Sequence, residues 1–115
     1  MNKETMHLEV MKVTQEIANT VENIYQIKQS LFMWELLRDK QLFELTPDTG
    51  WEGKNVDQRK RTEVLALQDD MIYVGFNYRY QRTKRDLDYA QMYLETLKTF
   101  RRGTESLIQL DYMEK

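Results

Sequence analysis

The first 45 residues of this chain contain neither glycine nor proline, and apolar side chains recur among them at steps of three and four. This spacing puts the apolar side chains on one stripe, so it predicts a helix over about residues 3–45. At about 1.5 Å per residue that helix is roughly 65 Å long, and so long a rod buries its apolar seam against another rod. The stripe consists of Met6, Val10, Val13, Ile17, Val21, Ile24, Ile27, Leu31, Trp34 and Leu37. Because Thr20, Arg38 and Gln41 interrupt it, we expect an irregular coiled coil.

The one stretch of turn residues surrounds Pro47, the only proline in the chain. A proline disfavours helix in the residue before it, so the first helix should end near Leu45 or Thr46. Asn55, or Asp57 just after it, is a suitable N-cap for the next helix. We therefore expect a loop over about residues 46–55.

A second apolar pattern predicts a helix over about residues 56–102. Gly103 marks a break in that helix, and the cations Arg101 and Arg102 before it suit a helix C-terminus. Residues 103–115 either form a short third helix that folds back or continue the second helix. The expected fold is all-α: one domain, residues 1–115, built as a hairpin of two long antiparallel helices.

Two apolar stripes run along the second helix, offset by two residues, so they lie on nearly opposite sides of it. The first helix can cover only one of them, and the other needs a third helix, a second subunit or a ligand. We therefore expect a homo-oligomer. One stripe contains Val64, Leu67, Met71, Val74 and Tyr78, and the other contains Tyr73, Phe76, Tyr80, Leu87, Ala90, Leu94 and Leu97. We take Tyr73, Phe76 and Tyr80 as the candidate protein interface.

The residue types that most enzymes and metal sites need are nearly absent. The chain has no cysteine and one histidine, His7. It therefore offers no residue for a thiolate site and at most one histidine for a Ser–His–Asp or His-rich site. We expect no enzyme activity, no metal and no cofactor. No run approaches the roughly 18 apolar residues that a membrane helix needs, so we expect no membrane contact and a cytoplasmic location.

Positive charge gathers in the second half of a chain whose net charge is −2. Residues 54–85 carry eight cations and four anions, whereas residues 1–50 carry five cations and eight anions. Arginines mixed with tyrosines are typical of sequence-tolerant single-strand binding, with Tyr78 and Tyr80 as candidate stacking residues. The alternative is that the basic second helix pairs with the acidic first helix. The candidate nucleic-acid-binding residues are Lys54, Arg59, Arg61, Arg79, Arg82, Lys84 and Arg85.

Trp51 stands in the loop between Gly50 and Gly53, away from both stripes. An indole is a favoured anchor at protein interfaces, so Trp51 is a candidate contact for a partner protein. The alternative is that it folds back and closes the end of the hairpin.

The segment Gly53-Lys54-Asn55-Val56-Asp57-Gln58-Arg59-Lys60 resembles the Gly-Lys-Asn-x-x-x-Arg-Lys turn of small bacteriophage proteins built as a helix, this turn and a second long helix. The chain departs from their pattern because its second helix is rich in tyrosine and methionine. The resemblance implies an accessory role in recombination or replication, in the cytoplasm of a bacterial host.

Three functions follow from these features. The first is a non-enzymatic accessory protein that oligomerises and binds or helps load single-stranded DNA. The second is a protein-binding inhibitor of a bacterial defence or host enzyme. The third is a component of virion assembly.

Overall fold

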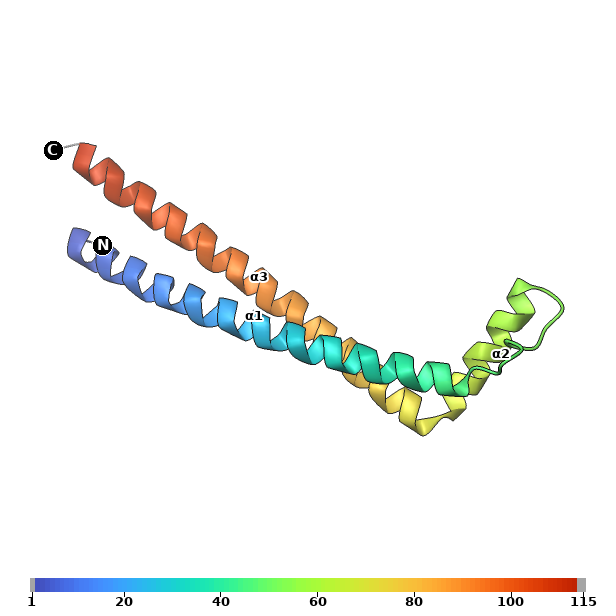
Figure 1. Cartoon of the computed structure of the whole chain (residues 1–115). Coiled ribbons are helices and arrows are strands. Elements are labelled where there is room, and N and C mark those ends of the chain that lie inside the picture. Colours follow the sequence, from blue (N-terminus) through green and yellow to red (C-terminus); the bar gives the residue numbers. More distant parts are fainter. Residues whose placement is uncertain (1, 114–115) are drawn as a thin grey trace. The chain divides into compact units, whose positions relative to one another are not determined.

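The computed structural model describes residues 2–113, and all three elements found there are helices: α1 (Lys3–Leu45), α2 (Val56–Asp69) and α3 (Met71–Met113). No strand occurs in this part of the chain. The long helix α1 packs antiparallel against the long helix α3, as Figure 1 shows, so the expected all-α helical hairpin is confirmed. The predicted bounds of the first helix and of the loop also agree with the structure.

The contacts divide the chain into two compact units. Unit 1 joins the part of α1 up to Ile27 with the part of α3 from Asp86 onward, and unit 2 is Lys28–Arg85. Each unit holds its own segment of the seam between α1 and α3.

Unit 1 contains all of the buried residues in the described chain. Its seam follows steps of three and four on both helices, the spacing of a coiled coil, and so each helix presents one continuous face to the other. The buried apolar side chains are Met6, Val13, Ile24 and Ile108, and the buried polar ones are Thr20 and Thr104.

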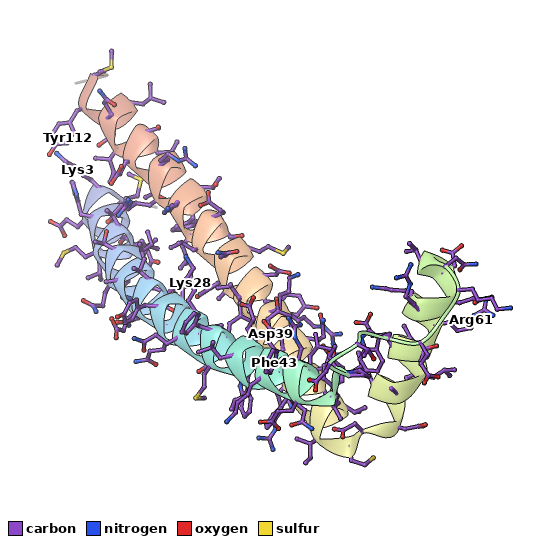
Figure 2. The ribbon with its side chains drawn as sticks, turned by 45° about the vertical axis from the view of Figure 1, so that its right-hand side comes forward. Lys3, Lys28, Asp39, Phe43, Arg61 and Tyr112 are labelled. Atoms are coloured by element: carbon purple, nitrogen blue, oxygen red, sulfur yellow. The ribbon has the colours of Figure 1, made fainter. Side chains whose placement is uncertain are left out.

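Thr20 and Lys3 are polar residues of α1 in unit 1 that each have a partner. The Thr20 hydroxyl donates a hydrogen bond to the backbone carbonyl of Glu16 at 2.8 Å, so this interruption of the stripe needs no bond across the seam. At the end of the unit, the ammonium of Lys3 lies 3.4 Å from the ring centroid of Tyr112 (Figure 2). This cation–π contact ties the first turn of α1 to the last turn of α3.

Unit 2 joins the two helices through aromatic rings and guanidinium groups. The rings of Trp34 on α1 and Phe76 on α3 lie 6.2 Å apart, and the guanidinium of Arg79 lies 4.9 Å from the Trp34 ring. The guanidinium of Arg38 lies 4.1 Å from the ring of Tyr80. No residue of Lys28–Arg85 is buried, so the seam of unit 2 consists of half-buried side chains.

The prediction of one helix over residues 56–102 is wrong, because the helix is interrupted at Asp70. Asp70 has extended backbone angles (φ −91°, ψ 108°), which end α2. Its carboxylate then accepts a hydrogen bond from the backbone N–H of Tyr73 at 2.7 Å and caps the start of α3. The Gln41 amide donates to the same carboxylate oxygen at 3.3 Å, so a polar residue of the α1 seam helps to hold the break.

The break expected at Gly103 is absent. α3 continues through this residue to Met113, so the C-terminal segment continues the helix as far as the structure describes it; residues 114–115 lie outside the described residues. Thr104 and Ile108 are buried just beyond the glycine. Their packing against α1 outweighs the helix propensity lost at one glycine, about 1 kcal/mol.

Replacing Gly103 by alanine is expected to stabilise the protein by roughly 0.5–1 kcal/mol, because a Cβ at this position meets no atom within 4 Å and alanine is the better helix former. Urea denaturation followed by far-UV circular dichroism measures the change. Gly50→Ala serves as the contrast, since Gly50 has a φ of +81° that alanine adopts poorly. A Gly103→Ala protein less stable than the parent would show that α3 is not a regular helix there.

Candidate nucleic-acid interface

Three candidate residues share the face of α3 that points away from the seam. With about 100° per residue, Tyr78, Arg82 and Arg85 fall within an arc of roughly 60°, opposite Phe76 and Tyr80. All three side chains are exposed, and Tyr78 is 64% accessible. We call these three residues the Tyr–Arg stripe.

The remaining candidate cations lie in different places. Arg79 is held against Trp34 in the seam, and Lys84 is exposed on a side of α3 away from the stripe. Lys54 lies in the loop, where its backbone N–H donates to the Gln58 side chain at 2.8 Å. Arg59 and Arg61 are exposed on α2, and Figure 2 shows Arg61 projecting from that helix.

Ion pairs do not join the basic region to the first helix. In residues 2–113 the ion pairs are Lys12–Glu9, Arg38–Asp39 and Lys98–Glu95, each formed within one helix. Arg82, Lys84 and Arg85 take part in none of them. The alternative in which a basic helix pairs with an acidic one therefore has no support among these contacts, and the cations stay available to a ligand.

The residues expected at a protein interface, Tyr73, Phe76 and Tyr80, belong to the stripe that α1 covers. All three are half-buried; Phe76 contacts Trp34, and Arg38 covers the ring of Tyr80. The uncovered stripe is the other one, with Met71, Val74 and Tyr78 exposed. Because a guanidinium covers the Tyr80 ring, Tyr78 is the better placed of the two tyrosines to stack on a base.

Sequence inspection missed an apolar stripe on α1. Phe32, Leu36 and Phe43 fall within about 40° on the helix, opposite the seam, and are 64%, 54% and 81% exposed. Figure 2 labels Phe43 at the C-terminal end of this stripe. Its signal in the sequence is the spacing of four and seven between these residues, which is shorter and weaker than the pattern of the seam. We call these residues the outer α1 stripe.

Trp51 folds back onto the start of α2. The indole is half-buried, and with Val56, Arg59 and Lys60 it lines a groove of about 390 Å³. The Thr62 hydroxyl donates to the backbone carbonyl of Glu52 at 2.8 Å, which fixes the returning loop along α2 (green in Figure 1). Asn55 caps α2 as expected, since its side chain accepts from the backbone N–H of Gln58 at 2.9 Å.

Gly53→Ala is expected to destabilise the loop and α2 by about 2–3 kcal/mol, because Gly53 has a φ of +153° and a Cβ there would lie 2.6 Å from the backbone nitrogen of Arg59. Urea denaturation and amide hydrogen exchange in α2 measure the effect. Gly50→Ala is the matched control, since its φ is also positive but a Cβ there meets no atom within 4 Å. Equal losses in both variants would contradict the tight approach at Gly53.

Tyr93, on α3 in unit 1, is a titratable group with a perturbed pKa. Partial burial of its phenol, a hydrogen bond to Glu16 at 3.2 Å and the negative charge of that carboxylate raise the pKa of Tyr93. In the described chain no three histidine, aspartate or glutamate side chains come together as metal ligands, and His7 is exposed. None of the described helices is long and apolar enough to span a membrane.

Comparison of the chain with protein families, with curated proteins and with solved structures finds no match in any of the three. The function must therefore be argued from the residues themselves.

Proposed function

We propose that this protein is a non-enzymatic accessory protein that self-associates and binds single-stranded DNA. The observation that carries the proposal is the Tyr–Arg stripe: Arg82 and Arg85 have no ion-pair partner in residues 2–113, and Tyr78 beside them is exposed. Unpaired arginines bind phosphates, and an exposed ring stacks on bases of any sequence. A role in recombination or replication rests on the resemblance of the Gly53–Lys60 turn.

The distribution of charge supports the same location. Lys28–Arg85 carries eleven cations and nine anions, whereas the rest of the sequence carries six cations and ten anions. A polyanion is therefore attracted to unit 2 and repelled by unit 1.

Self-association is supported by apolar surface without a partner in the chain. Unit 2 has no buried side chain, and the outer α1 stripe exposes Phe32 and Leu36 one helical turn apart, with Phe43 farther along the same face beyond Asp39. Exposed apolar side chains on one face of a helix are typical of surfaces that bind another protein, and a second copy is always present. Light scattering at tens of micromolar protein tests this part, and a strict monomer would contradict it.

A mobility-shift experiment with a labelled oligonucleotide tests the DNA part. The protein is expected to shift a single strand at low salt, and to shift a duplex of the same length less, because paired bases are not accessible to Tyr78. Absence of any shift at low salt would rule the proposal out.

A second function is favoured by the outer α1 stripe: a protein-binding module that engages an apolar face of a host protein. The measurement that separates it from the first is an affinity purification with and without nuclease. One stoichiometric host protein that is retained after nuclease treatment and lost in a Phe32→Ala variant supports this function. A virion component would instead appear in purified particles by mass spectrometry.

A further inference from the structure

The groove beside Trp51 combines an aromatic ring with two cations. Its walls are the loop residues Thr49–Trp51 and the first two turns of α2, and its volume of about 390 Å³ lies within the range of small-ligand sites. Val56 lies in it with 73% of its surface exposed, so the groove offers apolar surface beside the indole.

The loop that carries Trp51 is held in one shape by its own hydrogen bonds. The backbone N–H of Lys54 donates to Gln58, the Thr62 hydroxyl donates to the carbonyl of Glu52, and the backbone of Gly53 lies too close to Arg59 to admit a side chain. Since the wall is already ordered, a ligand that enters the groove loses little free energy in ordering it.

The charge of the groove favours an anion. Arg59 and Lys60 line it, and neither forms an ion pair in residues 2–113. The Nε–H of Arg59 donates to the backbone carbonyl of Asn55 at 3.3 Å, which directs this side chain back along the first turn of α2. Glu63 is the one acidic side chain in the lining, so the two cations outnumber it.

We infer that this groove is a nucleotide subsite, in which the indole of Trp51 stacks on one base of a single strand and Arg59 and Lys60 bind its phosphate. The inference rests on the proposed function and extends it to a second location within unit 2. A flat aromatic group joined to an anion matches the lining, which an aliphatic ligand or a metal ion does not. Glu63 opposes the phosphate, so Glu63→Gln is expected to strengthen binding.

The test uses a Trp34→Phe protein, in which Trp51 is the one remaining indole. Titration with a single-stranded thymidine oligonucleotide is expected to quench its fluorescence. In the parent protein, Trp51→Leu is expected to weaken oligonucleotide binding by roughly 5- to 100-fold, the usual effect of losing one stacking residue, and Trp51→Phe by less. Arg59→Gln with Lys60→Gln should also weaken binding. The double variant Lys28→Gln with Lys40→Gln is the matched control, because it removes the same charge from exposed lysines of unit 2 that neither line the groove nor belong to the candidate nucleic-acid-binding residues.

The outcomes separate the two proposals. Oligonucleotide binding with unchanged Trp51 fluorescence and unchanged affinity in Trp51→Leu overturns the subsite and leaves the proposed function standing. Equal losses in the two double variants show attraction to total charge and also overturn the subsite. No binding of any oligonucleotide overturns both, and quenching of Trp51 by polyglutamate in that case would assign the groove to an acidic peptide. Far-UV circular dichroism confirms that each variant is folded.

Discussion

Reversing the charge of both arginines in the Tyr–Arg stripe, by Arg82→Glu with Arg85→Glu, is expected to lower affinity for a single-stranded oligonucleotide roughly 10- to 100-fold at low salt. The change removes two phosphate contacts and places two negative charges against the backbone of the strand. Both side chains are exposed on the face opposite the seam, so the fold should survive. Fluorescence anisotropy of a labelled oligonucleotide measures the affinity.

The control for this variant is Lys12→Glu with Lys98→Glu, which alters the net charge of the chain by the same amount in unit 1. Its affinity is expected to change far less, because these two lysines lie outside unit 2 and each is paired with a glutamate. If both double variants lose affinity equally, binding depends on net charge and the stripe has no special role.

Trp34→Ala is expected to destabilise unit 2 by about 2–4 kcal/mol. Trp34 contacts the Phe76 ring and also carries the Arg79 guanidinium on its face, so its removal takes away two contacts between α1 and α3. Since no residue in this unit is buried, few other contacts can compensate. Urea denaturation followed by circular dichroism gives the change in the free energy of unfolding.

Tyr89→Ala provides the comparison for Trp34→Ala, because Tyr89 is also a large aromatic residue of a long helix but is 63% exposed. Its loss is expected to stay below about 1 kcal/mol. Losses of similar size in the two variants would mean that Trp34 does not join the helices.

The helical hairpin could be predicted because its signals are local and repeated. The apolar spacing of three and four from Met6 to Leu37, in a segment without glycine or proline that ends before Pro47, predicts the first helix, and the turn residues together with Asn55 predict the start of α2. The sequence shows that polar residues interrupt the seam, but it does not predict which residues they contact. Arg38 covers Tyr80 and Gln41 reaches Asp70, and both pairings depend on the register of α1 against α3.

The break at Asp70 was missed because no glycine or proline marks it and the apolar pattern continues across it. Its signal was an aspartate placed three residues before Tyr73, in N-cap position for α3. At Gly103 the sequence predicted a break that does not occur, because the tertiary packing of Thr104 and Ile108 stabilises the helix on the far side of this glycine. The helix propensity lost at a single glycine is small compared with the packing energy of its buried neighbours.

The sequence predicts which residue types form the candidate site, but it does not predict how they are arranged in space. The sequence shows where arginines and tyrosines gather, yet two stripes on α3 competed for the seam, and the register of the helices decides that Tyr80 is covered and Tyr78 is exposed. The meeting of Trp51 with Arg59 and Lys60 depends on the loop backbone at Gly53, which local sequence patterns do not specify.

The most direct test of the central idea, that free cations of unit 2 hold a nucleic-acid strand, is the dependence of oligonucleotide affinity on salt. For three to six phosphate contacts, the logarithm of the association constant should fall linearly against the logarithm of salt concentration with a slope of about −2 to −4. In the Arg82→Glu, Arg85→Glu variant, which loses two phosphate contacts, this slope should be less negative by about one to two. An affinity that is absent at low salt, or that does not change with salt, would contradict the account.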